Sequence, residues 1–225
     1  MRQKLGTMMA VLYPTIVDEL SKDLYSEHDD RRLRTVQIMG LLKKNPRVRD
    51  IMVNLIKDRD VKIRATAVNL LGKIIGAEDT ELILSLLSDP DKRVRANTVE
   101  ALESLGDKRL VPMLLRFKKD PSNRIRGNVL KALFSLGYQG IEDDLLAMIK
   151  SSDIFMQASA LWVITNVKIR SEELQDAAGF CLLSENEMVV TNARKALMAL
   201  ATPRAKGYLR YLAPQEVNSP SASLS

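Results

Sequence analysis

The feature that most constrains the fold of this chain is a repeat of about 31 residues. With Arg95 as the origin, equivalent positions recur at intervals of 30, 31, 31, 31 and 33 residues, at Arg34, Arg64, Arg95, Arg126, Gln157 and Val190. The residue before each origin is apolar, and so is the residue seven positions after it. A fixed period of this length is typical of proteins built from stacked units, because one such unit is too small to bury its own apolar face.

Residues 89–106, DPDKRVRANTVEALESLG, show the repeated unit most clearly. Their apolar side chains recur at three- and four-residue spacing, which predicts one buried face of an α-helix. We expect Asp89 to cap the start of this helix, Pro90 to occupy its first turn, and Gly106 to end it. An acidic or turn-forming residue also lies four positions before each origin and predicts a helix start in every repeat, at Asp30, Asp60, Asp91, Ser122, Asp153 and Asn186.

The block Asp-x-x-apolar-Arg-x-x-Ala/Val-x-x-Ala-Leu with this period resembles HEAT repeats, especially the short bacterial type also found in bilin lyases. The resemblance covers residues 14–202 and implies an all-α fold, an α-solenoid (right-handed superhelix) of about six HEAT-type helical hairpins. We expect residues 1–13 to form an N-terminal arm or cap, and residues 203–225 to form a short C-terminal cap and a disordered tail. The resemblance implies function only weakly, because solenoids of this kind hold many different molecules.

Residue types needed for common catalytic and metal sites are scarce in this sequence. The chain has one cysteine, Cys181, and one histidine, His28, and it lacks a glycine-rich phosphate loop. A thiolate cluster or a histidine-based site therefore cannot be assembled in the usual way. We predict no enzyme activity, no metal and no cofactor. No apolar run reaches the roughly 18 residues of a membrane span, and we expect a cytoplasmic location.

Charge is distributed unevenly along the chain. Residues 31–64 contain 11 basic and 3 acidic side chains, and residues 107–131 contain 8 and 2, whereas residues 132–193 contain 3 and 9. The basic N-terminal half could attract an acidic partner or a nucleic acid. A solvated surface is the simpler interpretation, since blocks of charge need not be binding sites.

The recurring aspartate and arginine side chains have two interpretations. They could grip phosphates, or they could serve the fold, and the resemblance to HEAT repeats implies the second, in which they tie the turn inside each hairpin and link it to the next repeat. Charges in such a turn need partners, because unpaired burial is costly. We predict a structural ladder made of Asp60, Arg64, Asp91, Arg95 and Arg126, which is lost at Gln157 and Val190.

The second helix of each hairpin, here called the B helix, lines the concave side in the family that the sequence resembles. Core side chains occupy offsets −1, 3 or 4, 6, 7 and 10 from the origin, so offsets 2, 5 and 9 should form an exposed ridge. This B-helix ridge is rich in asparagine, whose amide can both donate to and accept from a peptide backbone. Its candidate partner-binding residues are Thr66, Asn69, Asn97, Asn128, Lys131, Trp162, Asn166, Asn192 and Lys195.

Trp162 and Asn166 lie four residues apart and are similar to the Trp-x-x-x-Asn pair with which armadillo repeats clamp extended peptides. We therefore predict a non-enzymatic scaffold or adaptor that docks another protein or a peptide segment, which could be acidic, in the concave groove lined by the B helices. Simple packing is the competing interpretation for a lone tryptophan in a helix. The alternative function is nucleic-acid binding by the basic N-terminal half, because residues 151–166 loosely resemble a repeat of HEAT-like DNA glycosylases. That family uses several tryptophans for base recognition, and this chain has one.

Overall fold

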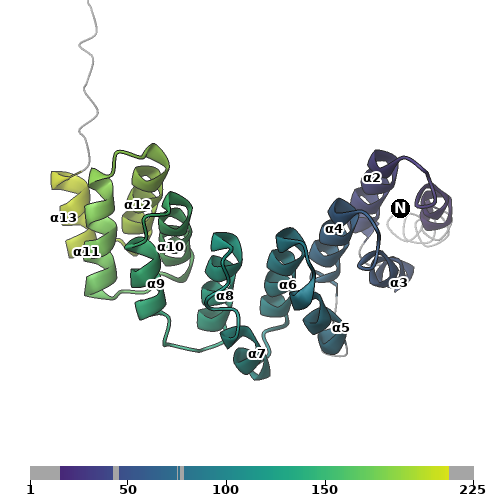
Figure 1. Ribbon diagram of the computed structural model, residues 1–225, viewed down its shortest axis with the longest axis horizontal. Helices are drawn as coiled ribbons and strands as arrows, with labels where there is room; N and C mark the ends of the chain where they lie inside the picture. The colour runs from purple at the N-terminus through teal and green to yellow at the C-terminus, as the bar shows by residue number, and fades with distance from the viewer. Residues whose placement is uncertain (1–15, 43–45, 75, 77–78, 213–225) are drawn as a thin grey trace, which may run out of the picture. The chain divides into compact units, whose positions relative to one another are not determined.

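The structure is a computed structural model that describes residues 16–42, 46–74, 76 and 79–212 (Figure 1). Every regular element in these ranges is a helix, which confirms the predicted all-α class. The chain divides into two compact units, of which the first ends at Tyr138 and the second begins at Gln139. The expected arm or cap over residues 1–13 and the expected tail over residues 213–225 lie outside the described residues.

Unit 1 is a series of helical hairpins. After a helix over residues 16–23, its elements are α2 (Asp29–Met39), η1 (Gly40–Leu42), α3 (Pro46–Leu55), α4 (Val61–Leu71), α5 (Thr80–Ser85), η3 (Leu86–Ser88), α6 (Lys92–Leu105), η4 (Lys108–Leu110), α7 (Val111–Leu115) and α8 (Asn123–Ser135). The B helices α2, α4, α6 and α8 pack in that order against one another, and each of α3, α5 and α7 packs on the B helix that follows it. The hairpins are therefore stacked through their B helices.

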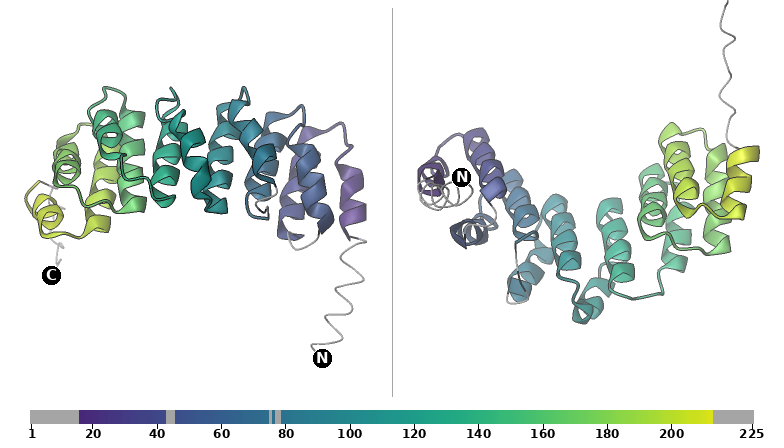
Figure 2. Two further views of the ribbon diagram at one scale, coloured as in Figure 1. Left: turned by 90° about the horizontal axis from the view of Figure 1, so that it is seen from below. Right: turned by 180° about the vertical axis from the view of Figure 1, so that it is seen from behind.

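Unit 2 continues the same pattern in α9 (Glu142–Ile149), α10 (Ile154–Val167), α11 (Glu172–Phe180), η5 (Cys181–Leu183), α12 (Glu187–Leu200) and α13 (Pro203–Tyr211). The B helices α10 and α12 lie side by side, as Figures 1 and 2 both show. α13 packs on α11 and α12. Its start is fixed by Thr202, whose hydroxyl accepts a hydrogen bond from the Ala205 amide at 3.1 Å, and by Pro203 in the first turn.

The buried positions of the repeat are the predicted ones in the second to sixth repeats. The residue before the origin is at most 8 % exposed in all five, at Ile63, Val94, Ile125, Met156 and Val189. The residue seven positions after the origin is fully buried in all five, at Leu71, Leu102, Leu133, Ile164 and Leu197. Aliphatic side chains thus supply the continuous core that each hairpin lacks alone.

The predicted register is wrong in the first repeat. Leu41, expected in the core, is 81 % exposed, and Arg34, expected at the origin, is exposed. The buried arginine is Arg32, which is 8 % exposed and whose Nη1 donates to the Asp58 carboxylate at 2.8 Å. The first interval is therefore 32 residues, not 30.

The corrected register aligns the core of α2 with that of α4. Thr35, Val36 and Met39 are buried at three, four and seven residues after Arg32, as Ala67, Val68 and Leu71 are after Arg64. Leu33 and Leu41 have the apolar spacing of the repeat when Arg34 is taken as the origin, but they do not lie on the buried face. The face is decided by which side of α2 meets α4, and a short sequence pattern with extra apolar residues does not determine that.

The predicted helix starts are correct four residues before the origin in the second to sixth repeats and wrong at Asp30 and Asp89. Asp30 lies inside α2, whose N-cap is His28. The N-caps of α4, α6, α8, α10 and α12 are Asp60, Asp91, Ser122, Asp153 and Asn186. α6 begins at Lys92, so Asp89 and Pro90 lie in the preceding turn, where the Asp89 carboxylate accepts from the Asp91 amide at 2.8 Å. Gly106 ends α6 in the left-handed conformation, with φ of 65°, as predicted.

Gly72, the C-cap residue of α4, lies in close contact with α6. A Cβ atom at this position would lie 2.6 Å from the Ala101 Cβ and 2.9 Å from the Ala101 Cα. The substitution Gly72→Ala is expected to lower the free energy of unfolding of unit 1 by about 1–3 kcal/mol, because the two helices must move apart. Urea unfolding followed by circular dichroism measures this change.

The matched control for Gly72 is Gly207 in α13, where an added Cβ would meet nothing within 4 Å. Gly207→Ala is expected to be neutral or to stabilise by up to about 1 kcal/mol through helix propensity. Equal losses of stability in both variants would show that close packing at Gly72 is not the cause.

Candidate functional site

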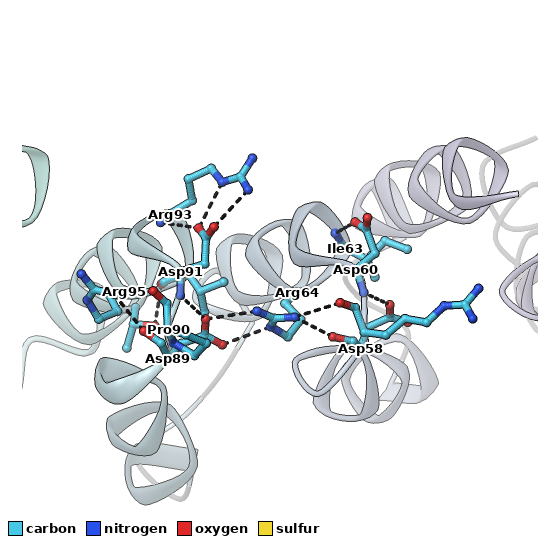
Figure 3. Close-up of polar contacts among 12 residues, drawn as sticks. Asp58, Asp60, Ile63, Arg64, Asp89, Pro90, Asp91, Arg93 and Arg95 are labelled. Carbon is cyan, nitrogen blue, oxygen red and sulfur yellow. Dashed lines mark hydrogen bonds and ion pairs between the residues drawn. The ribbon is translucent and has the colours of Figure 1, made fainter.

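The arginine at the origin of the second repeat ties two hairpins together (Figure 3). Arg64 Nε and Nη2 donate to the two carboxylate oxygens of Asp89, at 3.1 and 3.2 Å. Its Nη1 donates to the main-chain carbonyls of Asp58 and Arg59, at 2.9 and 3.2 Å. One guanidinium therefore fastens the turn of its own hairpin to the turn of the next, and its side chain is only 16 % exposed.

Arg95 repeats both kinds of contact, and Arg126 repeats the contact with the turn of its own hairpin. Arg95 Nη1 donates to the carbonyl of Asp89 at 2.9 Å, and its Nε lies 3.8 Å from the Asp120 carboxylate. Arg126 Nε donates to the carbonyl of Asp120 at 3.3 Å. These contacts support the structural interpretation of Arg64, Arg95 and Arg126, because all of them join parts of the protein to one another.

The aspartates that pair with the ladder arginines were missed by the sequence analysis. Asp58, Asp89 and Asp120 lie six residues before the origin in three successive repeats, at a spacing of 31 residues. In the next two repeats the same column holds Ser151 and Ser184. This periodic column was a visible signal, but Asp89 was interpreted as a helix cap because a proline follows it.

Asp60 and Asp91 lie two residues after this aspartate column and are the N-cap residues of α4 and α6. The Asp60 carboxylate accepts from the amides of Lys62 and Ile63, at 2.8 and 3.0 Å, and Asp91 accepts from the amide of Arg93 at 2.7 Å. The Arg93 side chain also donates to Asp91, at 3.0 and 3.1 Å, and these bonds lower the pKa of the Asp91 carboxyl to about 2. Both aspartates thus satisfy backbone donors at helix starts.

The lowered pKa of Asp91 predicts a pH dependence of stability. The folded state favours the charged carboxylate, so this contribution is present above the ordinary carboxyl pKa of about 3.9 and is lost as the pH falls through about 2. We expect Asp91→Asn, which keeps an oxygen for the helix cap, to reduce the loss of stability across this range. Urea midpoints measured across the range test it, with Asp30→Asn as an exposed control. Identical pH profiles for Asp91→Asn and the unsubstituted protein would contradict the assignment.

In unit 1 the asparagines of the B-helix ridge bond to the preceding B helix. The Asn97 amide donates to the carbonyl of Ala65 at 2.7 Å, and the Asn128 amide donates to the carbonyl of Ala96 at 3.2 Å. These two bonds are equivalent in successive repeats. Asn128 is only 5 % exposed, so its predicted place on an exposed ridge is wrong. It is buried because neighbouring B helices approach closely there.

The charged side chains beside these asparagines are also paired. Arg124 donates to the Asn97 side-chain oxygen at 3.0 Å, and the Asn128 amide donates to Glu100 at 2.8 Å. Lys131 donates to Glu103 at 2.5 Å. Thr66 and Asn69 complete the predicted ridge in unit 1 and are half-buried. The ridge in this unit is therefore largely engaged in bonds between its own helices.

Unit 2 carries the remaining residues of the predicted ridge on α10 and α12. We define the α10–α12 face as the seven residues Phe155, Ser159, Trp162, Asn166, Asn192, Lys195 and Met198. Phe155 is 56 % exposed, Trp162 39 % and Met198 63 %, and Lys195 is exposed. Phe155 and Trp162 are separated by seven residues, which places them on one side of α10. Phe155 and Met198 were not predicted as site residues.

The polar groups of the α10–α12 face differ from those of unit 1. The Asn166 amide donates to the carbonyl of Trp162 at 2.7 Å, and the Asn192 amide donates to the carbonyl of Met188 at 2.8 Å, so each bonds within its own helix. Within the described residues the Trp162 indole N–H has no hydrogen-bond acceptor. α10 contains no charged residue in its 14 positions. The signal that could have revealed this face was the absence of charge from residues 154–167.

Other sites considered from the sequence have no geometry to support them. None of the helices in the described part of the chain combines the length and the hydropathy needed to cross a bilayer. The same residues contain no group of three side chains placed to hold a metal ion. His28 is the exposed N-cap residue of α2, and Cys181 is nearly buried, with the pKa of its thiol raised by that burial.

The stacked hairpins and their arginine–aspartate ties define a class of protein, the HEAT-type α-solenoid. Residues 80–153 match the family model described as HEAT repeats, so this stretch of the chain consists of HEAT repeats. The resemblance seen in the sequence is thereby confirmed, including its relation to the bilin-lyase type at the level of fold. A comparison with curated proteins finds no match to the sequence.

Several solved structures have the same fold. The E. coli protein YibA is 18 % identical, with a TM-score of 0.58 and coverage of 85 % of this chain and 74 % of its own. Human deoxyhypusine hydroxylase in complex with glycerol is 17 % identical, with a TM-score of 0.50 and coverage of 92 % and 91 %. The complex of CpcE and CpcF of phycocyanin lyase from a Nostoc species is 15 % identical, with a TM-score of 0.50 and coverage of 86 % and 92 %. Similarity at these identities shows the fold alone.

Proposed function

We propose that this chain is a non-enzymatic scaffold that docks a protein or peptide segment on the α10–α12 face of unit 2, with Trp162 as the anchor. The observation that carries the proposal is the exposed pair Phe155 and Trp162 on a helix without charge. A helix that is apolar on most sides is normally buried on most sides. The exposed side of α10 therefore resembles a surface that a partner covers.

The chemistry of Trp162 fits this role. Tryptophan combines a large apolar surface with an N–H donor and is enriched among the residues that dominate binding energy. The free indole N–H and the exposed oxygen of the Asn166 side chain offer one donor and one acceptor to a peptide backbone. In unit 1, by contrast, the amides of Asn97 and Asn128 are already bonded to the neighbouring helix. Unit 2 is for this reason the better candidate for docking.

The partner segment should be mainly apolar with a carboxylate near Lys195. Lys195 is exposed on α12 and is the charged member of the α10–α12 face. An acidic side chain placed beside it would gain a charge-assisted hydrogen bond. A location in the cytoplasm and the absence of enzyme activity are parts of the same proposal. The enzyme names carried by two of the similar structures belong to those proteins.

Capture of partners by matched variants tests the proposal. The unsubstituted protein, the double variant Trp162→Ala with Asn166→Ala, and the control Tyr211→Ala would be compared side by side, with captured proteins identified by mass spectrometry. Tyr211 is 77 % exposed on α13 and lies outside the face. We expect the double variant alone to lose a specific partner while its circular dichroism is unchanged. Equal capture of partners by all three proteins would contradict the proposed docking site at Trp162 and Asn166.

A second candidate, nucleic-acid binding, has one observation in its favour. The first turns of α4, α6 and α8 contain exposed Lys62, Arg93 and Arg124 and no acidic residue. Two of these cations are already paired, Arg93 with Asp91 and Arg124 with Glu100, which reduces the charge available to phosphates. This candidate is tested by measuring the binding of a DNA duplex at two salt concentrations, because phosphate contacts weaken steeply with salt. No binding at low salt would eliminate this candidate.

A further inference from the structure

A pocket of about 420 Å³ lies in unit 2 between the α9–α10 hairpin and the α11–α12 hairpin, and none of its lining residues belongs to the α10–α12 face. Its apolar wall includes Ile149 at the end of α9, Val189 on α12, and Phe180 and Leu183 around η5. Ile149 and Val189 are almost fully buried, whereas Phe180 and Leu183 are 65 % and 62 % exposed at its rim. The pocket thus has an apolar floor and an open apolar edge.

The pocket occupies the place that the ladder pair holds in unit 1. Between consecutive hairpins of unit 1, the arginine at the origin reaches the aspartate of the next turn, as Arg64 reaches Asp89. In unit 2 the residue at the origin of α10 is Gln157, and the residue of the next turn is Ser184, and both line the pocket. The shorter Gln157 turns back to its own hairpin, where its amide donates to the carbonyl of Ser151 at 2.8 Å. Among the residues that the structure describes, no ion pair joins these two hairpins.

The polar groups that line the pocket favour an anion. Lys150 is the charged lining residue, is exposed, and has no ion-pair partner among the described residues. The Ser184 hydroxyl oxygen accepts from the Asn186 amide at 3.2 Å, so its hydrogen remains free to donate. Two donors at the edge of an apolar pocket match the two oxygens of a carboxylate, with a charge-assisted bond from the lysine.

The size of the pocket favours a small molecule. Its volume falls within the roughly 300–1,000 Å³ of small-ligand sites, which are mostly apolar with a few converging polar groups. It exceeds the space that one apolar side chain of a docked peptide would fill. We propose that this pocket binds a small amphiphilic carboxylate, with its apolar ring or chain between Ile149, Val189 and Phe180 and its carboxylate on Lys150 and Ser184.

The only cysteine of the chain, Cys181, lines this pocket and provides a direct measurement. The probes are 4-phenylbutyrate and its neutral amide, and the readout is the rate at which iodoacetamide modifies Cys181, followed by intact mass. At about ten times its Kd, the acid leaves about one-eleventh of the pockets free, so modification should slow about tenfold. The neutral amide should protect Cys181 from modification far less than the acid does. Absence of protection by the acid at its solubility limit would overturn the proposal.

Two variants test whether the carboxylate of the acid binds at Lys150. Lys150→Gln should lower the affinity for 4-phenylbutyrate by about tenfold or more, because it removes a hydrogen bond to a charged group. The affinity for the neutral amide should not change. Lys206→Gln, at an exposed lysine of α13 outside the pocket, is the control. Equal protection in the unsubstituted protein and in Lys150→Gln would contradict the assignment of the carboxylate. Since Lys150 is exposed, its replacement should not disturb folding.

The double variant Gln157→Arg with Ser184→Asp places the residues of the unit 1 ladder at the seam of unit 2. It should close the pocket and abolish protection while the circular dichroism spectrum is kept. Persistent protection in this folded variant would show that the acid binds elsewhere. Fluorescence of Trp162, the single tryptophan, separates this site from the proposed docking face, because filling the pocket should leave it unchanged. A fluorescence change without protection of Cys181 would assign the acid to the α10–α12 face instead and would contradict the proposal.

Discussion

Replacing Arg64 with alanine is expected to lower the free energy of unfolding by about 3 kcal/mol, the lower end of the cost of removing one partner of a buried ion pair, because Arg64 and Asp89 keep 16 % and 9 % of their side-chain exposure. The substitution leaves the Asp89 carboxylate, whose side chain is 9 % exposed, without its guanidinium. It also removes donors from the main-chain carbonyls of Asp58 and Arg59. The loss thus falls on both turns that Arg64 joins. Urea unfolding followed by circular dichroism measures it.

The matched control for Arg64 is Arg34, which the sequence places in the same column. Arg34 is exposed in α2, so Arg34→Ala should change the free energy of unfolding by no more than about 0.5 kcal/mol. Arg32→Ala should instead resemble Arg64→Ala, because Arg32 pairs with the buried carboxylate of Asp58. A large loss from Arg34→Ala and none from Arg32→Ala would contradict the corrected register.

Replacing Trp162 with alanine is expected to weaken binding of the partner segment by about 2–4 kcal/mol, a factor of roughly 30–1,000 in Kd. The expectation rests on the proposed function and on the exposure of the indole beside Phe155. A binding residue on the surface contributes to the complex more than to the free protein. The melting temperature of Trp162→Ala should for this reason stay close to that of the unsubstituted protein.

Titration of Trp162 fluorescence with the purified segment measures the affinity of the unsubstituted protein, and calorimetry measures that of the variant. Trp162→Phe should recover part of the binding, because it restores apolar contact without the N–H donor. Parallel losses of binding and melting temperature in Trp162→Ala would identify the side chain as a core residue. The docking proposal would then have lost its anchor.

The asparagines of the B-helix ridge show where reasoning from helical periodicity stops. Asn97 and Asn128 were assigned to an exposed face by elimination of the core positions of a single helix. The structure adds a neighbouring helix at that face, whose carbonyl groups at Ala65 and Ala96 accept their amides. Periodicity identifies the face that one hairpin buries, but it does not say how closely the next B helix approaches the adjoining side.

The ladder column shows a related limit. Arg64, Arg95 and Arg126 were recognised from their period, and their structural role was inferred from family resemblance. Their partners Asp89 and Asp120 have the same period, but Asp89 was interpreted locally as a helix cap and the column was not recognised. An ion pair between hairpins joins residues 25 positions apart, and a local pattern around a proline cannot reveal it.

The sequence by itself determined the class of fold, the repeat, the helix starts of the second to sixth repeats and most of the core, because these depend on spacing within one hairpin. Only the tertiary structure decided that Arg32 and not Arg34 enters the ladder, that Asn128 is buried, and that a pocket opens where Gln157 and Ser184 replace the ion pair. The physical reason is the same in all three. Each depends on contact between neighbouring hairpins, whose separation is set by packing and not by the period of the sequence.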